Sequence, residues 1–247
     1  MDTLNNITAV YKREFKAYFE SPVAYVFLVG FLVLTGFLTF FVTFFFERSL
    51  ADLQPFFMWH PWVYLLLVPA ATMGLWAEER RSGTLELLLT LPITMLQTII
   101  GKFLAAWTFI VIALALTFPI VLTTCYLGAP DMGPIWCAYI GSALMAGAYV
   151  AVGMLMSSTT RSQVIAFVLA LITCLLLVLA GWAPVTSLFV KWAPAWLVDG
   201  IAAIGFIPAY ESLQRGVLGL GDVTYYLSVI IFMIGATHMV LDNRKTA

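Results

Sequence analysis

The chain has 247 residues, of which 62% are hydrophobic and 10% are charged, and its formal net charge at pH 7 is -1. A soluble protein of this length could not bury so much apolar surface, so the composition excludes an ordinary soluble domain and indicates a membrane protein. The net charge says nothing about nucleic acid, but the sequence has no block of lysines or arginines, and we expect no nucleic-acid partner.

The first segment, residues 1–21, is mostly polar but carries apolar side chains at helical spacing. Ile7 and Phe15 belong to this apolar set, whereas Lys12 and Lys16 occupy other positions. The pattern predicts an amphipathic helix that lies in the membrane interface. The simpler alternative is a polar lead-in. The segment lacks the short apolar core and cleavage site of a secretory signal, so we do not expect it to be one.

Six apolar runs follow, and together they predict an all-α polytopic membrane protein with one transmembrane domain. We expect transmembrane helices at residues 23–46, 62–77, 103–126, 135–156, 164–182 and 223–241. Pro69 and Pro119 lie inside two of these runs, where neighbouring helices can satisfy the backbone carbonyls that proline frees.

Positive charge predicts the orientation of these helices, because loops on the cytoplasmic side carry the excess of lysine and arginine. One set of segments holds nine such residues, namely Lys12, Arg13, Lys16, Arg80, Arg81, Lys102, Arg161, Arg244 and Lys245. The opposite set holds three, namely Arg48, Lys191 and Arg215. We therefore expect both chain termini on the cytoplasmic side.

The segment 78–92, between the second and third apolar runs, is the most informative part of the sequence. It opens with four consecutive charges that cannot stay in hydrocarbon, namely Glu78, Glu79, Arg80 and Arg81. Ser82-Gly83-Thr84 predicts a break, after which Leu85 and Glu86 begin a short surface helix that Pro92 stops. Gly101-Lys102 marks the expected return to the bilayer. The alternative is an ordinary interfacial helix between two spans.

The run from Glu79 to Leu88, followed by Pro92 and Gly101-Lys102, resembles the cytoplasmic signature of ABC-2 type transporter permeases. That signature is a charged pair, Gly-Thr, an acidic residue, a leucine run, a proline and a Gly-Lys pair. A weaker match, Tyr210 to Leu218 leading to Asp222, resembles the gliding-motility-type subgroup.

The resemblance implies a mechanism. Permeases of this family dimerise, as two copies or as a copy and a homologue, and each half binds one cytoplasmic ABC ATPase. The chain would be an exporter subunit of the bacterial cytoplasmic (inner) membrane and not itself an enzyme. It has no phosphate-binding loop of the Gly-x-x-x-x-Gly-Lys-Ser/Thr type, so ATP and magnesium are expected on a separate chain. We expect no cofactor, metal or catalytic residue here. The predicted ATPase-coupling residues are Glu78, Glu79, Arg80, Arg81, Ser82, Gly83, Thr84, Leu85, Glu86 and, in a second turn, Arg161.

Residues 183–222 are too apolar for a solvated loop. We expect short helices that dip back into the outer leaflet, as the resemblance also implies. Glu211 and Arg215 are four residues apart, so they could pair on one helix face and form an extracytoplasmic gate or contact an accessory protein. The alternative is a structural plug that only supports the last two spans.

An intramembrane enzyme is the rival class, but the sequence has no Gly-x-Ser-x-Gly, no His-Glu-x-x-His and no paired intramembrane aspartates. His60 and His238 are interpreted as structural, and Cys125, Cys137 and Cys174 as buried thiols. Three hypotheses remain: an ABC permease that exports a substrate, an ABC-type subunit that transmits force to an extracytoplasmic partner without transport, and an unrelated six-span scaffold.

Overall fold

A computed structural model describes residues 3–47, 52–84, 93–190 and 194–243, and this part of the chain forms helices and no strand. The predicted all-α class is confirmed. Within these residues six helical segments are long and apolar enough to span a membrane, namely Ala24–Val42, Gln54–Ser82, Met95–Leu127, Met132–Thr159, Gln163–Gly181 and Leu220–Asp242.

The N-terminal region folds into α1 (Thr3–Glu20), α2 (Pro22–Phe37) and the π-helix η1 (Leu38–Val42). Pro22 opens α2, a position where its missing N–H costs nothing. The first expected span, 23–46, is too long at its end, because regular helix gives way to a π turn and stops at Val42. Three threonine hydroxyls in this stretch donate to the carbonyl four residues back, a contact that bends helices.

The second span is longer than the expected 62–77. It comprises α3 (Gln54–Phe57), α4 (His60–Thr72) and α5 (Gly74–Ser82). The four charged residues 78–81 therefore lie in the last turns of the same helical segment.

The third span is built from α7 (Met95–Ala115) and α8 (Phe118–Leu127), which are separated close to Pro119. The helix begins well before the expected residue 103, because Thr94 and Gln97 form a capping box at its start. Gly101 and Lys102 lie inside α7, two turns after its start, and their position at the bilayer boundary stays a prediction.

Helix α9 (Met132–Thr159) is the centre of the bundle and contacts α4, α5, α7, α10 (Gln163–Gly181), α13 (Phe206–Gln214) and α14 (Leu220–Asp242). Helices α9 and α14 extend slightly beyond the expected ranges 135–156 and 223–241, and α10 lies close to the expected range 164–182. A Cβ atom at Gly153 would collide with the Thr72 side chain, so glycine there lets α9 approach α4 closely.

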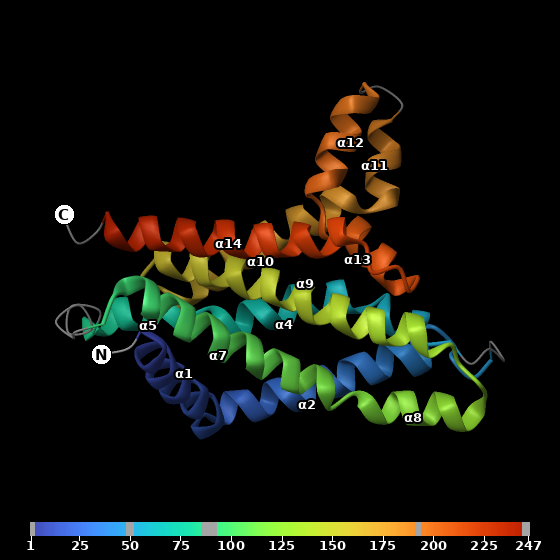
Figure 1. The fold of residues 1–247 in the computed structure, drawn as a ribbon, viewed down its shortest axis with the longest axis horizontal. Coiled ribbons are helices and arrows are strands. Elements are labelled where there is room, and N and C mark those ends of the chain that lie inside the picture. The colour runs from blue at the N-terminus through green and yellow to red at the C-terminus, as the bar shows by residue number, and fades with distance from the viewer. Residues whose placement is uncertain (1–2, 48–51, 85–92, 191–193, 244–247) are drawn as a thin grey trace.

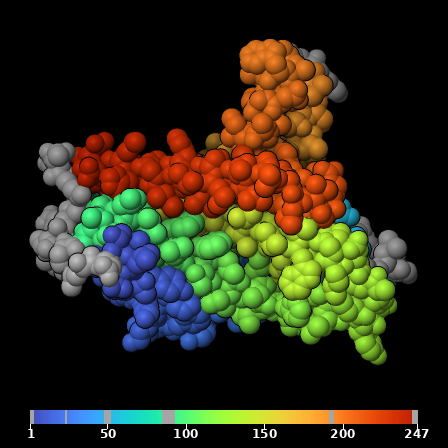
Figure 2. All heavy atoms as spheres, in the orientation of Figure 1, coloured from blue at the N-terminus to red at the C-terminus, as the bar shows by residue number. Residues whose placement is uncertain are grey.

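Between α10 and α14 lie α11 (Ala183–Phe189), α12 (Ala195–Ile204) and α13. Helices α11 and α12 stand out from the side of the bundle (Figure 1, Figure 2), whereas α13 packs against α9. Short helices in 183–222 are thus present, and their position in an outer leaflet stays a prediction. Helices α1 and α5 and the last turn of α14 lie at the same end of the bundle (Figure 1).

Candidate functional site

The charged residues that the sequence singled out lie in the last turns of α5. Glu78 and Arg81 are exposed, and Glu79 and Arg80 are half-buried. Helix α5 ends at Ser82, where Gly83 takes the left-handed conformation (φ 73°) that favours glycine at a helix C-terminus. The predicted break at 82–84 is confirmed. Leu85 and Glu86, with the rest of the expected surface helix, lie outside the described residues.

The bend between α4 and α5 is fixed to α9 by one buried hydroxyl. Ser157 Oγ accepts from the backbone N–H groups of Trp76 and Ala77, both at 3.0 Å, and donates to the carbonyl of Met73 at 2.7 Å. In an unbroken helix those two N–H groups would donate to carbonyls four residues earlier. A side chain inserted into this ladder is a recognised cause of a helix bend, and here it joins α5 to α9.

A second set of bonds joins α5 to the turn between α9 and α10. Arg80 Nη1 donates to the carbonyl of Ser158 at 2.7 Å, and Gln163 Nε2 donates to Glu78 Oε2 at 3.1 Å. The last carbonyls of α9 have no helical partner and carry the negative end of the helix dipole, so a guanidinium is favoured there. Arg161 is exposed in the same turn. The structure thus brings the two predicted coupling segments together.

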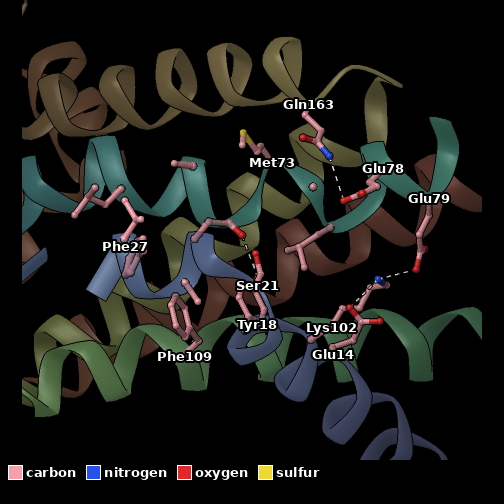
Figure 3. Close-up of a pocket in the computed structure, with 18 of the residues that line it drawn as sticks. Glu14, Tyr18, Ser21, Phe27, Met73, Glu78, Glu79, Lys102, Phe109 and Gln163 are labelled. Carbon is pink, nitrogen blue, oxygen red and sulfur yellow. Dashed lines mark hydrogen bonds and ion pairs between the residues drawn. The ribbon is translucent and has the colours of Figure 1, made fainter. Parts of the chain in front are cut away.

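An ion cluster joins α5 to α7 and α1, and the sequence analysis did not predict it. Lys102 Nζ lies 2.9 Å from Glu79 Oε1 and 3.2 Å from Glu14 Oε2, and its side chain is only 3% exposed (Figure 3). Arg13 lies 2.5 Å from Glu14 Oε1 and 3.7 Å from Glu79 Oε1. Lys102 also sits 5.2 Å from the ring centroid of Trp76, a cation–π distance.

The cluster sets the charge state of Glu14. Burial raises the pKa of its carboxyl, but Lys102 and Arg13 outweigh burial and hold the pKa below its ordinary value. The hydrogen bond to Glu14, against the opposing effect of burial, raises the pKa of Arg13. Glu14 is therefore ionised at neutral pH, and charge-assisted bonds of the cluster hold α1, α5 and α7 together.

Helix α1 is fixed along its length. A Cβ atom at Gly101 would lie 2.7 Å from Val10 Cγ1, so glycine lets α1 lie directly on α7. Asn6 Nδ2 donates to Gln97 Oε1 at 3.2 Å, and Tyr18 donates to the carbonyl of Ala71 in α4 at 3.1 Å. The expected amphipathic helix is therefore part of the packed bundle and not only a surface anchor.

At the opposite end of the bundle, Glu211 lies in α13 and Arg215 follows its last residue, and the two do not form an ion pair. The polar contact made by α13 comes instead from Tyr210, whose hydroxyl donates to the carbonyl of Phe57 at 3.2 Å and lies 3.2 Å from His60 Nδ1. Ser142 Oγ lies 2.9 Å from the same nitrogen and 2.8 Å from the hydroxyl of Tyr64.

His60 is fully buried in this network, which joins α4, α9 and α13. The interpretation of His60 as structural fits these contacts. The three cysteines are free, and within the described residues no group of three histidine, cysteine, aspartate or glutamate side chains could hold a metal ion.

Comparison with known proteins bears on the same residues. The family model described as ABC-2 family transporter protein matches residues 55–195, a range that includes α4, α5, α7, α9 and α10. No curated protein matches the chain closely enough to count as a relative.

Proposed function

Because this chain belongs to the ABC-2 family of transporter proteins, we propose that it is the membrane subunit of an exporter and that it couples ATP hydrolysis on a separate ATPase to movement of a substrate. Family membership, with the six apolar helices, makes it a multi-pass membrane protein and implies association with an ABC ATPase in a typically dimeric assembly. It also removes the unrelated six-span scaffold from the three hypotheses.

The observation that carries the proposal is the way α5 is bound to its neighbours. Glu79 is paired with Lys102 of α7, and Arg80 donates to α9. Ser157 holds the bend between α4 and α5, which precedes these two residues in the chain. A force applied at residues 78–84 would reach three helices through short polar bonds instead of being lost in a loose loop. Such connection is what a coupling element needs.

The outward side of α5 is available to a partner. Glu78, Arg81 and Arg161 are exposed, and α5, which carries the first two, lies at one end of the bundle (Figure 1). We propose that these side chains contact the ATPase, that this end faces the cytoplasm of a bacterium, and that ATP and magnesium are bound by the partner chain. Charges at the rim of an interface direct docking and partner choice more than they add affinity.

The test is the ATPase activity of the complex reconstituted with this chain. Glu79→Ala and Arg80→Ala should lower the stimulation of the ATPase by the membrane subunit and leave its co-purification with the chain in place, because the two residues hold α5 from its inner side. Lys16→Ala is the matched control, since Lys16 pairs only with Glu20 on the exposed face of α1. Wild-type stimulation in both α5 variants would contradict the proposal.

A second candidate is force transmission to an extracytoplasmic partner without transport. The projecting α11–α12 hairpin favours it, because its exposed apolar side chains, including Leu188 and Trp196, stand apart from the bundle. Stimulation of the ATPase by an added lipid, polysaccharide or peptide would support export. Stimulation only by a protein captured through the hairpin would support force transmission.

A further inference from the structure

A cavity of about 610 Å³ lies beside the ion cluster, between α1, α2, α4, α5 and α7 (Figure 3). One part of its wall is apolar and includes Val26, Phe27, Leu67 and Phe109. The other part is polar, with carboxylates and an ammonium group. Val26 is 72% exposed, so the cavity is open along the α2 side of the bundle.

Small residues create this space, namely Ala17, Ala24, Gly30, Ala70, Ala71 and Gly74. A Cβ atom added at Gly30, which lines the cavity, would meet no atom within 4 Å, so there is room for a larger side chain at this position. An apolar groove open to the side of a membrane protein admits a hydrocarbon chain, because leaving such walls to water is unfavourable.

The polar part is acidic. Glu14, Glu78 and Glu79 line it together with a single cation, Lys102. Lys102 is already held between Glu14 and Glu79. Arg13 and Lys102 compensate the charges of Glu14 and Glu79, whereas Glu78 accepts from the neutral amide of Gln163. The groove therefore keeps a negative charge and favours a ligand that brings an N–H donor and a positive charge.

We propose that this groove binds a cationic amphiphile, whose apolar chain lies between α2, α4 and α7 and whose protonated amine lies among Glu14, Glu78 and Glu79. The geometry disfavours an anionic amphiphile, because Lys102 and Arg13 are already held by Glu14 and Glu79, and the head would also meet the carboxylate of Glu78. The further step, that such an amphiphile is the exported substrate, rests on the proposed function.

The test uses the purified full-length chain in a neutral detergent, without an ATPase. A long-chain alkylamine that carries a photoreactive group on its chain is cross-linked at neutral pH, and the labelled peptides are mapped by mass spectrometry. We expect labels on α2 and α4. Dodecylamine should compete for them at roughly tenfold lower concentration than dodecyl sulfate, the scale of one charge contact at a half-exposed site.

Two variants separate the parts of the site. Gly30→Leu fills the groove and should lower labelling by at least about tenfold. Gly36→Leu is the matched control, because Gly36 lies on the same helix, has equal room around its Cβ and does not line the groove. Glu78→Gln, at an exposed position where the new amide oxygen can still accept from Gln163, should reduce the preference for dodecylamine over dodecyl sulfate.

Labelling that survives Gly30→Leu would overturn the proposal, as would equal competition by the amine and the sulfate. If a second copy of the chain covers the groove in a dimer and no label is found on α2 and α4, that result would overturn the proposal too. Because the assay contains no ATPase, loss of amine binding leaves the coupling proposal standing, and loss of coupling in Glu79→Ala or Arg80→Ala leaves the wild-type binding result standing.

Discussion

Replacement of Lys102 by methionine tests whether the ion cluster holds the coupling end together. The ammonium group is buried, and it contacts carboxylates that are themselves only 15% and 17% exposed. Methionine keeps most of the apolar stem but leaves Glu14 and Glu79 without their buried cation, with only the half-exposed Arg13 beside them. Removal of one partner from a buried ion pair costs about 3–5 kcal/mol, since the remaining charge is left uncompensated.

Denaturant unfolding of the purified chain in mixed micelles measures this loss. Lys102→Met should lower the unfolding free energy by about 3–5 kcal/mol, whereas Lys16→Met, at a position 77% exposed, should change it by less than about 1 kcal/mol. Combination of Lys102→Met with Glu14→Gln and Glu79→Gln should recover most of the loss, because no buried charge then remains. A loss below about 1 kcal/mol for Lys102→Met would refute the reasoning, as would a triple variant no more stable than the single one.

Three further predictions follow from the same contacts. The lowered pKa of Glu14 means that its stabilisation is complete above the ordinary value of 4.5 and is lost as the pH falls through the lowered value, so the difference in melting temperature between wild type and Glu14→Gln should close on acidification below 4.5. Ser157→Ala should cost about 1–3 kcal/mol in unfolding free energy, because two buried N–H groups lose their acceptor, while Ser158→Ala should cost less, since that hydroxyl bonds only within its own helix. Spin labels at Leu66 in α4 and Ile140 in α9, both exposed, should keep one distance with and without ATP in the complex; two distances would show that these helices move apart.

The sequence predicted the elements well and their contacts poorly. Apolar length alone located all six spans, because a helix that crosses the hydrocarbon core of a bilayer needs about 20 mostly apolar residues. The ends of those spans were less predictable. The break predicted at 82–84 is where α5 ends, but the expected range 62–77 did not include the charged turns before it, in which Arg80 bonds the α9 terminus and Glu79 bonds Lys102.

The ion cluster was missed although two signals for it are present in the sequence. Lys102 stands alone in an otherwise apolar run, and a lone cation at such a position needs a counter-charge. Glu14 is four residues from both Val10 and Tyr18, so it lies on the face of α1 that packs into the bundle. What the sequence could not supply is the pairing itself, because Glu14, Glu79 and Lys102 meet only when α1 lies on α7, a contact that depends on the absent side chain at Gly101.

Two bonds of α9, one near its C-terminal end and one in its first half, indicate how a movement at α5 would travel. Ser157 joins α9 to α5, and Ser142, fifteen residues earlier in the sequence, joins it to His60 in α4. Fifteen residues of α-helix span about 22 Å, so α9 is fixed to the second span at two widely separated points. A helix held at two such points cannot tilt against its partner without breaking a buried hydrogen bond. We therefore expect α4, α5 and α9 to move as one unit. Tyr210 would carry α13 with them, because its hydroxyl contacts His60. This rigid unit would link the charged end of the bundle to the end near α11 and α12, and no separate chain of small shifts is needed.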